Sequence, residues 1–358
     1  MRLAIVADAC LPTADDWSRN PRTLAEGLTG LGHEVTLLAT ASGAPTAADH
    51  TGRHARAMLS PCGADTGTAL TLLRPGCDTV LSLGTGAPTA AAVLAATLGI
   101  PLAVFLPPRL FDADPPPAGY GRLLCRHLPA AMLIAESRRQ LATARHHGAD
   151  PHRVFVVPPG IDVGPPPAPG GRGDDGRLRL LVDATGIAAQ EQRFLAEVLA
   201  TLAAGRHRIH TTVLGDATTG HLWDGRPDTA VLTPPDTATL AGLYHDADVI
   251  LVPGGGDRTV ALLRAMAAGR ALLAADSPAV QDTVGTTRNG MLARAGDPHE
   301  WVDKLDYLLD GHALRLHLGR GARLHAETHH SLAQTLRELD TRLVSLAASW
   351  RYPEPAGS

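Results

Sequence analysis

Short apolar runs alternate with amphipathic segments along nearly the whole chain. In the first half, the runs that predict strands cover residues 2–8, 33–40, 78–84, 102–108, 130–136 and 154–160. Helical patterns lie between them at residues 21–32, 89–99 and 137–148; Pro21 suits a first helical turn, and Gly32 and Gly148 suit helix ends. This alternation predicts a parallel sheet with helices on both faces.

A Pro/Gly-rich segment, VGPPPAPGGRGDDGR at residues 163–177, interrupts the pattern and predicts a linker. The alternation then restarts, with strands expected at 177–184, 209–216, 229–234, 249–254 and 271–276 and helices near 189–204, 238–247 and 260–269, before an amphipathic region from 298 to about 350. The predicted fold class is therefore α/β, with two Rossmann-like doubly wound domains facing across a cleft. The predicted boundaries are an N-terminal domain at 1–162, the linker at 163–177, a C-terminal domain at 178–330, and a helix and tail at 331–358.

Composition narrows the function classes. Hydrophobic residues make up 44% and charged residues 19%, as in a globular protein, and the net charge of −4 gives no general attraction to nucleic acid. Only one of the 32 basic residues is a lysine, which we interpret as a codon bias.

The four cysteines form no CxxC pair, so we expect reduced thiols and no thiolate metal site. Asp8 interrupts the apolar start before a secretory segment could form, and we expect a cytoplasmic protein.

Two stretches raise the question of membrane contact. Residues 79–108 carry no formal charge, but glycines and prolines divide them into short pieces, which favours strand, helix and strand over a membrane helix. Residues 118–129 contain Arg122 and Arg126 and could dock on a membrane or an acceptor, yet two arginines are more typical of a solvated helix. Membrane association is therefore unsupported by the sequence.

Several phrases occur in an order that resembles one family. They are MRLAIVADACLP, LAEGLTGLGHEVTLLAT, LIAESRRQL, VFVVPPGIDV, LYHDADVILVPGGGDRTVALLRAMAAGRALLAAD and NGMLARAGDP. Together they resemble the family 4 glycosyltransferases, which have the two-domain GT-B fold and transfer a sugar from a nucleotide-sugar with retention of configuration. The alpha-mannosyltransferase-like members look nearest. The resemblance extends to about Arg323.

The donor-site motif departs from what the resemblance implies. Members of the family carry two glutamates separated by seven residues, of which the first approaches the donor sugar and the second holds the ribose hydroxyls. Here the second position is Arg264, and the first falls on Gly256, or on Asp257 if one residue is deleted. A guanidinium only donates hydrogen bonds, so Arg264 cannot replace the ribose acceptor.

The family's diphosphate anchor is also changed. The resemblance implies an Arg and a Lys five residues apart after the first strand of the second domain, where this chain has Thr185 and Gln190. Both positive charges are absent. The helix start after the glycine loop could restore only a small part of the lost attraction, and Arg258 is among the nearest candidate replacements by sequence.

Each candidate site residue has a structural alternative. Asp257, the candidate catalytic residue, also suits the N-cap of the following helix, which we favour. Arg264 is either an anion-binding residue or a solvated helix residue. The candidate donor-binding residues are Gly254, Gly255, Gly256, Arg258, Thr259, Arg264, Thr185 and Gln190. The turn Gly84-Thr85-Gly86 imitates half of a dinucleotide fingerprint, but its third glycine is missing.

The sequence thus predicts a retaining glycosyltransferase that uses a UDP- or GDP-sugar and an unidentified acceptor, with no cofactor and no metal. We interpret the 17 histidines as surface residues. The alternative is a catalytically silent homologue that acts as a binding or partner protein, motivated by the simultaneous change at 185, 190 and 264. An NAD-type oxidoreductase is a minor third hypothesis. The donor sugar, the acceptor and the oligomeric state are not predicted.

Overall fold

The computed structural model describes residues 1–8, 20–40, 60–61, 73, 76–107, 121–165, 176–205, 207–215, 220–223, 228–233, 236–254, 258–285 and 288–350. The chain divides into two compact units, one formed by Met1–Gly160 with Leu332–Ser358 and the other by Ile161–Ser331. Residues 166–175 of the predicted linker lie outside the described part.

The first unit contains a parallel sheet with the order β3-β2-β1-β4-β5-β6-β7. Its strands are β1 (Arg2–Ala7), β2 (Glu34–Ala39), β3 (Ser60–Pro61), β4 (Thr79–Leu83), β5 (Leu102–Phe105), β6 (Met132–Ala135) and β7 (Val154–Val156). Its helices are α1 (Pro21–Gly30), α3 (Ala87–Leu98), the π-helix η1 (Leu123–His127), α6 (Arg138–His146) and α13 (Leu332–Ser349). The charge-free stretch is therefore strand, helix and strand, as predicted. No helix in the described part of the chain is long and apolar enough to cross a membrane.

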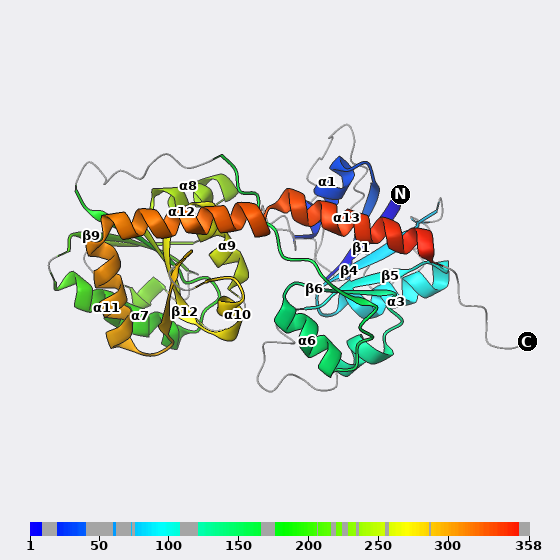
Figure 1. The fold of residues 1–358 in the computed structure, drawn as a ribbon, viewed down its shortest axis with the longest axis horizontal. Coiled ribbons are helices and arrows are strands. Elements are labelled where there is room, and N and C mark those ends of the chain that lie inside the picture. Colours follow the sequence, from blue (N-terminus) through cyan, green and yellow to red (C-terminus); the bar gives the residue numbers. More distant parts are fainter. Residues whose placement is uncertain are drawn as a thin grey trace, which may run out of the picture. The chain divides into compact units, whose positions relative to one another are not determined.

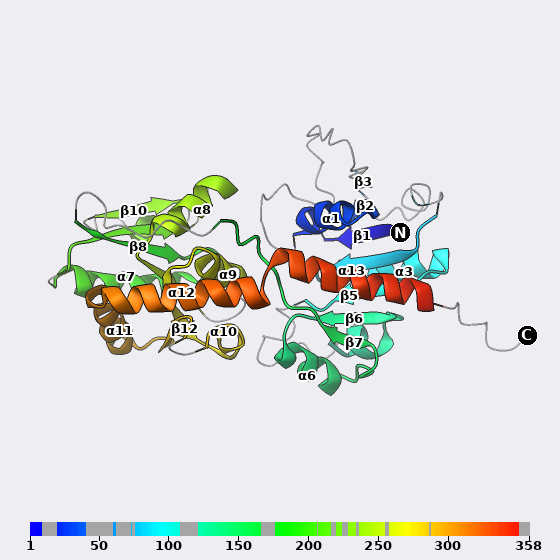
Figure 2. The same ribbon diagram turned by 45° about the horizontal axis from the view of Figure 1, so that its top comes forward.

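Alternate residues of β1 supply the two cores of this unit. Leu3 and Ile5 pack with residues of α1 and α13 on one face, whereas Ala4 and Val6 pack with residues of α3 on the other. Figures 1 and 2 show these helices around the sheet. An imidazole–carboxylate contact of 2.7 Å between His33 Nε2 and Asp340 Oδ1 also attaches α13 to this unit.

The second unit contains another parallel sheet, with the order β10-β9-β8-β11-β12-β13. Its strands are β8 (Leu178–Asp183), β9 (Ile209–Leu214), β10 (Thr229–Leu232), β11 (Val249–Val252), β12 (Ala271–Asp276) and β13 (Met291–Arg294). Its helices are α7 (Ala189–Ala203), η2 (Gly220–Leu222), α8 (Thr237–Asp246), α9 (Thr259–Ala267), α10 (Pro278–Gln281), α11 (Pro298–Asp310) and α12 (His312–His329). Residues of α7 and α11 pack on one face of this sheet and residues of α8 and α9 on the other.

The α/β prediction is confirmed, and most strands and helices occur where the apolar pattern predicts them. The apolar pattern does not predict β13, and it does not divide the region after residue 298 into α11, α12 and α13. That region is amphipathic throughout, so periodicity alone does not mark the breaks at Gly311 and His330.

Candidate functional site at the strand ends of the second unit

The carboxyl ends of β8 and β11 lie side by side, because these parallel strands are neighbours in the second sheet. The turn after β8 contains Thr185, and the loop after β11 leads to Arg258, which donates hydrogen bonds to that turn. The structure therefore brings together two segments that the sequence analysis singled out separately. Ligands of doubly wound sheets bind at this edge, and it is the candidate functional site.

Asp183, the last residue of β8, is the centre of a buried hydrogen-bond network. Its side chain is 3% exposed. One carboxylate oxygen accepts from Thr185 N at 3.1 Å, from the Thr185 hydroxyl and from Arg258 Nη2 at 3.2 Å, and the other accepts from the Tyr244 hydroxyl. Burial, followed by the charge of Asp183, raises the pKa of Tyr244 well above its usual range, so the phenol stays protonated as a donor.

Arg258 directs its two terminal nitrogens at the protein itself. Nη1 donates to Thr185 O at 2.5 Å and Nη2 to Asp183 O at 2.6 Å, and only 9% of the residue is exposed. Its Nε atom is buried and has no hydrogen-bond partner among the described residues. This guanidinium therefore holds the turn after β8 against the start of α9, and its terminal nitrogens are engaged before any ligand binds.

The other predicted residues lie around this network. Thr259 is the first residue of α9, and Gln190 is exposed in the first turn of α7. Arg264 is half-buried on α9, and its positive charge lowers the pKa of Tyr244, as the charge of Arg258 also does, so it lies within electrostatic range of that phenol. The structure thus places these side chains at or near one edge of the sheet.

The glycine loop is only partly described, because Gly255, Gly256 and Asp257 lie outside the described residues. Gly254 has a φ of +89°, and a Cβ at that position would meet Ile187 Cγ2 at 2.8 Å and Glu191 Oε2 at 3.2 Å. The close approach at Gly254 is therefore to the protein's own α7 segment.

The interpretation of Asp257 as the N-cap of α9 falls on a residue outside the described part of the chain and stays a prediction. Among the described residues α9 begins at Thr259, and the position before it is Arg258, which makes no side-chain capping hydrogen bond because a guanidinium has no acceptor atom.

Sequence reasoning missed three residues of this edge, namely Asp183, Tyr244 and Glu191. The Glu191 carboxylate accepts from Ala188 N at 3.3 Å and so lies at the start of α7. A carboxylate at a helix start opposes a second anion there. Of the three, only Asp183 has a sequence signal: it is a polar residue at the end of a buried strand, and such residues lie at the edge where ligands bind.

The dinucleotide-like turn of the first unit is already occupied by a carboxylate of the protein. Asp8, directly after β1, accepts from Thr85 N at 2.6 Å, Gly86 N at 2.9 Å and Ala87 N at 2.6 Å, at the start of α3. A Cβ on Gly84, whose φ is +111°, would lie 2.4 Å from the Asp8 carboxylate. The turn binds this internal anion, which disfavours the oxidoreductase hypothesis because a cofactor phosphate would need the same donors.

Replacing Asp8 by Ala is expected to lower the free energy of unfolding by about 2 kcal/mol, because the start of α3 loses its only described side-chain acceptor. Denaturant unfolding would measure the loss. Asp150→Ala is the matched control, since the Asp150 carboxylate accepts one local hydrogen bond from His152 N. Equal stabilities of the two variants would contradict the assigned role of Asp8.

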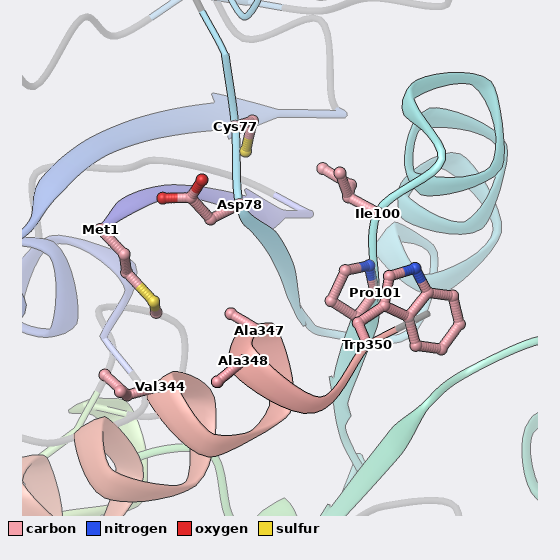
Figure 3. A pocket seen from close by; sticks show the side chains of 9 residues that line it. All are labelled: Met1, Cys77, Asp78, Ile100, Pro101, Val344, Ala347, Ala348 and Trp350. Atoms are coloured by element: carbon pink, nitrogen blue, oxygen red, sulfur yellow. The ribbon is translucent and has the colours of Figure 1, made fainter. Parts of the chain in front are cut away.

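A groove of about 440 Å³ lies where the strands of the first sheet begin, at the end opposite to Asp8 (Figure 3). Met1, Asp78 and Pro101 precede β1, β4 and β5, and the end of α13 with Trp350 forms the other wall. Because the groove lies at the amino ends of the strands, it is not where ligands of this fold class bind.

Most of the second unit matches the model of a known protein family. Residues 182–311 match the family model described as "Glycosyl transferases group 1". The chain is 29% identical over 220 residues to the D-inositol 3-phosphate glycosyltransferase of Paenarthrobacter aurescens (strain TC1), covering 56% of this chain and 54% of that protein. It is 30% identical over 244 residues to the protein of that name from Kineococcus radiotolerans, covering 58% and 56%. The chain spans about half the length of the curated relatives it matches.

Solved structures resemble nearly the whole chain. HepE from Anabaena in complex with UDP-glucose has a TM-score of 0.75 at 14% identity, covering 96% of this chain and 100% of that one. Sucrose-phosphate synthase from Thermosynechococcus elongatus has a TM-score of 0.78 at 15% identity, covering 98% and 100%. The predicted GT-B class of two α/β domains is confirmed, and the match to the glycosyl transferases group 1 model extends over most of the second unit.

Proposed function

We propose that this protein is a glycosyltransferase that transfers a sugar from a nucleotide-sugar to an acceptor that is still unidentified. The observation that carries the proposal is the match of residues 182–311, which include the paired ends of β8 and β11, to the glycosyl transferases group 1 model. The similar structure of HepE was obtained with UDP-glucose, which supports a nucleotide-sugar as the donor; both UDP- and GDP-sugars stay candidates.

The finer assignments are part of the same proposal. By resemblance to family 4, and within it to the mannosyltransferase-like members, transfer would retain the anomeric configuration and need no metal. Fixed positive groups rather than a bound cation would then stabilise the leaving diphosphate. Asp257 is the proposed catalytic residue, with Gly254, Gly255, Gly256, Thr259 and Arg264 on the donor side. A cytoplasmic location stays a prediction from the sequence.

The side chains at the carboxyl ends of β8 and β11 predict that the nucleotide-sugar donor binds weakly. Thr185 and Gln190 carry no charge, and the loss of two charge-assisted hydrogen bonds costs about 3–6 kcal/mol, or roughly two to four decades of affinity. Three of the five N–H groups of Arg258 donate to Asp183 and Thr185 and only 9% of the residue is exposed, so little of this guanidinium is left to replace the missing pair. This observation favours the second candidate function, a catalytically silent homologue that binds a sugar or a partner protein.

Calorimetric titration with UDP, GDP and their glucose and mannose conjugates tests the proposal. We expect binding that is lost in Gln190→Glu, which places a negative charge where the resemblance implies a lysine. Gln334→Glu makes the same charge change at an exposed position on α13 and should bind like the unmodified chain. No heat at millimolar ligand with the unmodified protein would overturn the proposal.

A further inference from the structure

The interpretation of the histidines as surface residues is wrong for several of them: His33, His147 and His330 are buried, and His207 of the second unit has a nearly buried side chain. The side chain of His207, in the connection between α7 and β9, is only 9% exposed. Its Nε2 atom faces the last turns of α11, where Asp306 and Asp310 are 44% and 51% exposed. The potential ligand atoms of these three residues all lie within 4.8 Å of one another.

The distances are close to those of a metal site. His207 Nε2 lies 2.7 Å from Asp306 Oδ1 and 3.8 Å from Asp310 Oδ1. Tetrahedral ligands at zinc bond lengths of about 2.0–2.2 Å are separated by about 3.3–3.6 Å, so shifts of less than about 1 Å would bring both pairs to that spacing. The two aspartate side chains are partly exposed, so they can make such shifts and a water molecule can reach the fourth position.

Electrostatics also favour a cation here. Asp306 and Asp310 are one helical turn apart, so their like charges oppose each other on one face of α11. Both lie near the carboxyl end of that helix, where the helix dipole disfavours negative charge. A bound cation would offset both the repulsion between the two carboxylates and their unfavourable interaction with the helix dipole.

We propose that His207, Asp306 and Asp310 bind a divalent transition-metal cation, and that Zn²⁺ is the representative metal. An imidazole nitrogen with two carboxylate oxygens suits zinc, whereas magnesium and calcium prefer oxygen ligands alone. The site is structural: it ties the connection before β9 to the end of α11. It lies toward the amino end of β9, so it is separate from the donor edge and takes no part in the proposed sugar transfer.

Calorimetric titration of Zn²⁺ into the full chain, free of tags and stripped with a chelator, tests the proposal. We expect one equivalent to bind, and Asp310→Asn or His207→Gln to weaken binding by about tenfold or more. Asp303→Asn, at an exposed position on the same helix, and His317→Gln, at an exposed position on α12, are the matched controls and should bind like the unmodified chain.

Thermal unfolding provides a second measurement that does not depend on sugar transfer. Zn²⁺ should raise the Tm of the unmodified chain and of both controls, and Mg²⁺ at the same concentration should not. Asp310 is exposed, so its variant is expected to fold and to show no zinc-dependent shift. No binding at 1 mM Zn²⁺ (roughly the millimolar limit of weak association), or binding that survives both substitutions, would show that the cluster is only an ion pair and overturn the proposal.

Discussion

The variant Thr185→Arg/Gln190→Lys/Arg264→Glu is expected to bind UDP- or GDP-sugars about two to four decades more tightly than the unmodified chain. Two donors for the diphosphate and one acceptor for the ribose hydroxyls would be restored at the edge where β8 and β11 end. The three changes leave the net charge unaltered, since two positive charges are gained and one arginine becomes a glutamate. A gain in affinity would therefore come from the positions of the charges. Calorimetry with each nucleotide-sugar would measure it.

A matched variant, Thr201→Arg/Gln334→Lys/Arg337→Glu, makes the same changes at exposed positions near the end of α7 and on α13 of the first unit. It should bind the donor like the unmodified chain. If both triple variants bind alike, the donor does not occupy the end of β8. Turnover by the unmodified chain would exclude the silent homologue, whereas turnover that appears only in the restored variant would support it.

Asp183→Ala is expected to lower the free energy of unfolding by about 3–5 kcal/mol, the range for removing one member of a buried ion pair. The guanidinium of Arg258 would stay buried without its counter-charge, and the Tyr244 hydroxyl would lose its acceptor. Denaturant unfolding of the full chain would measure the loss. We also expect weaker donor binding, because the turn that contains Thr185 is held by the same carboxylate.

Two further variants separate the parts of this network. Tyr244→Phe removes one hydrogen bond to a charged group and should cost about 1.5–3 kcal/mol. Adding Arg258→Met to Asp183→Ala removes the unpaired charge, so the double variant should be more stable than Asp183→Ala alone. A loss below about 1 kcal/mol for Asp183→Ala, the size of an ordinary hydrogen bond, would contradict a buried ion pair.

The sequence predicted the elements well because their signal is local. The central strands β4, β5, β6 and β11 are buried along their whole length and read as short apolar runs, as in Val249–Val252. Where the signal is not local the prediction was incomplete. The packing of α13 on the first unit, through Leu339 and Leu343, depends on which surface is free to accept an apolar face, and periodicity does not contain that information.

The candidate site was predictable only in part, for a related reason. Thr185, Gln190 and Arg264 were found because their spacing could be compared with a family motif. Tyr244 and Arg258 reach Asp183 across 61 and 75 positions of sequence, and no spacing rule connects them. The same holds for Asp8, whose carboxylate meets Ala87 across 79 positions.

The sequence by itself determined two α/β units with parallel sheets, and it showed that the charges expected for diphosphate and ribose binding are absent at 185, 190 and 264. Only the tertiary structure decided what the remaining charges do. Arg258 is engaged by Asp183, Asp8 occupies the helix start that resembled a nucleotide site, and His207 faces two aspartates instead of solvent. The physical reason is that strand and helix formation follows local periodicity, whereas the partner of a buried charge is whichever opposite group the packed chain brings within a few ångströms.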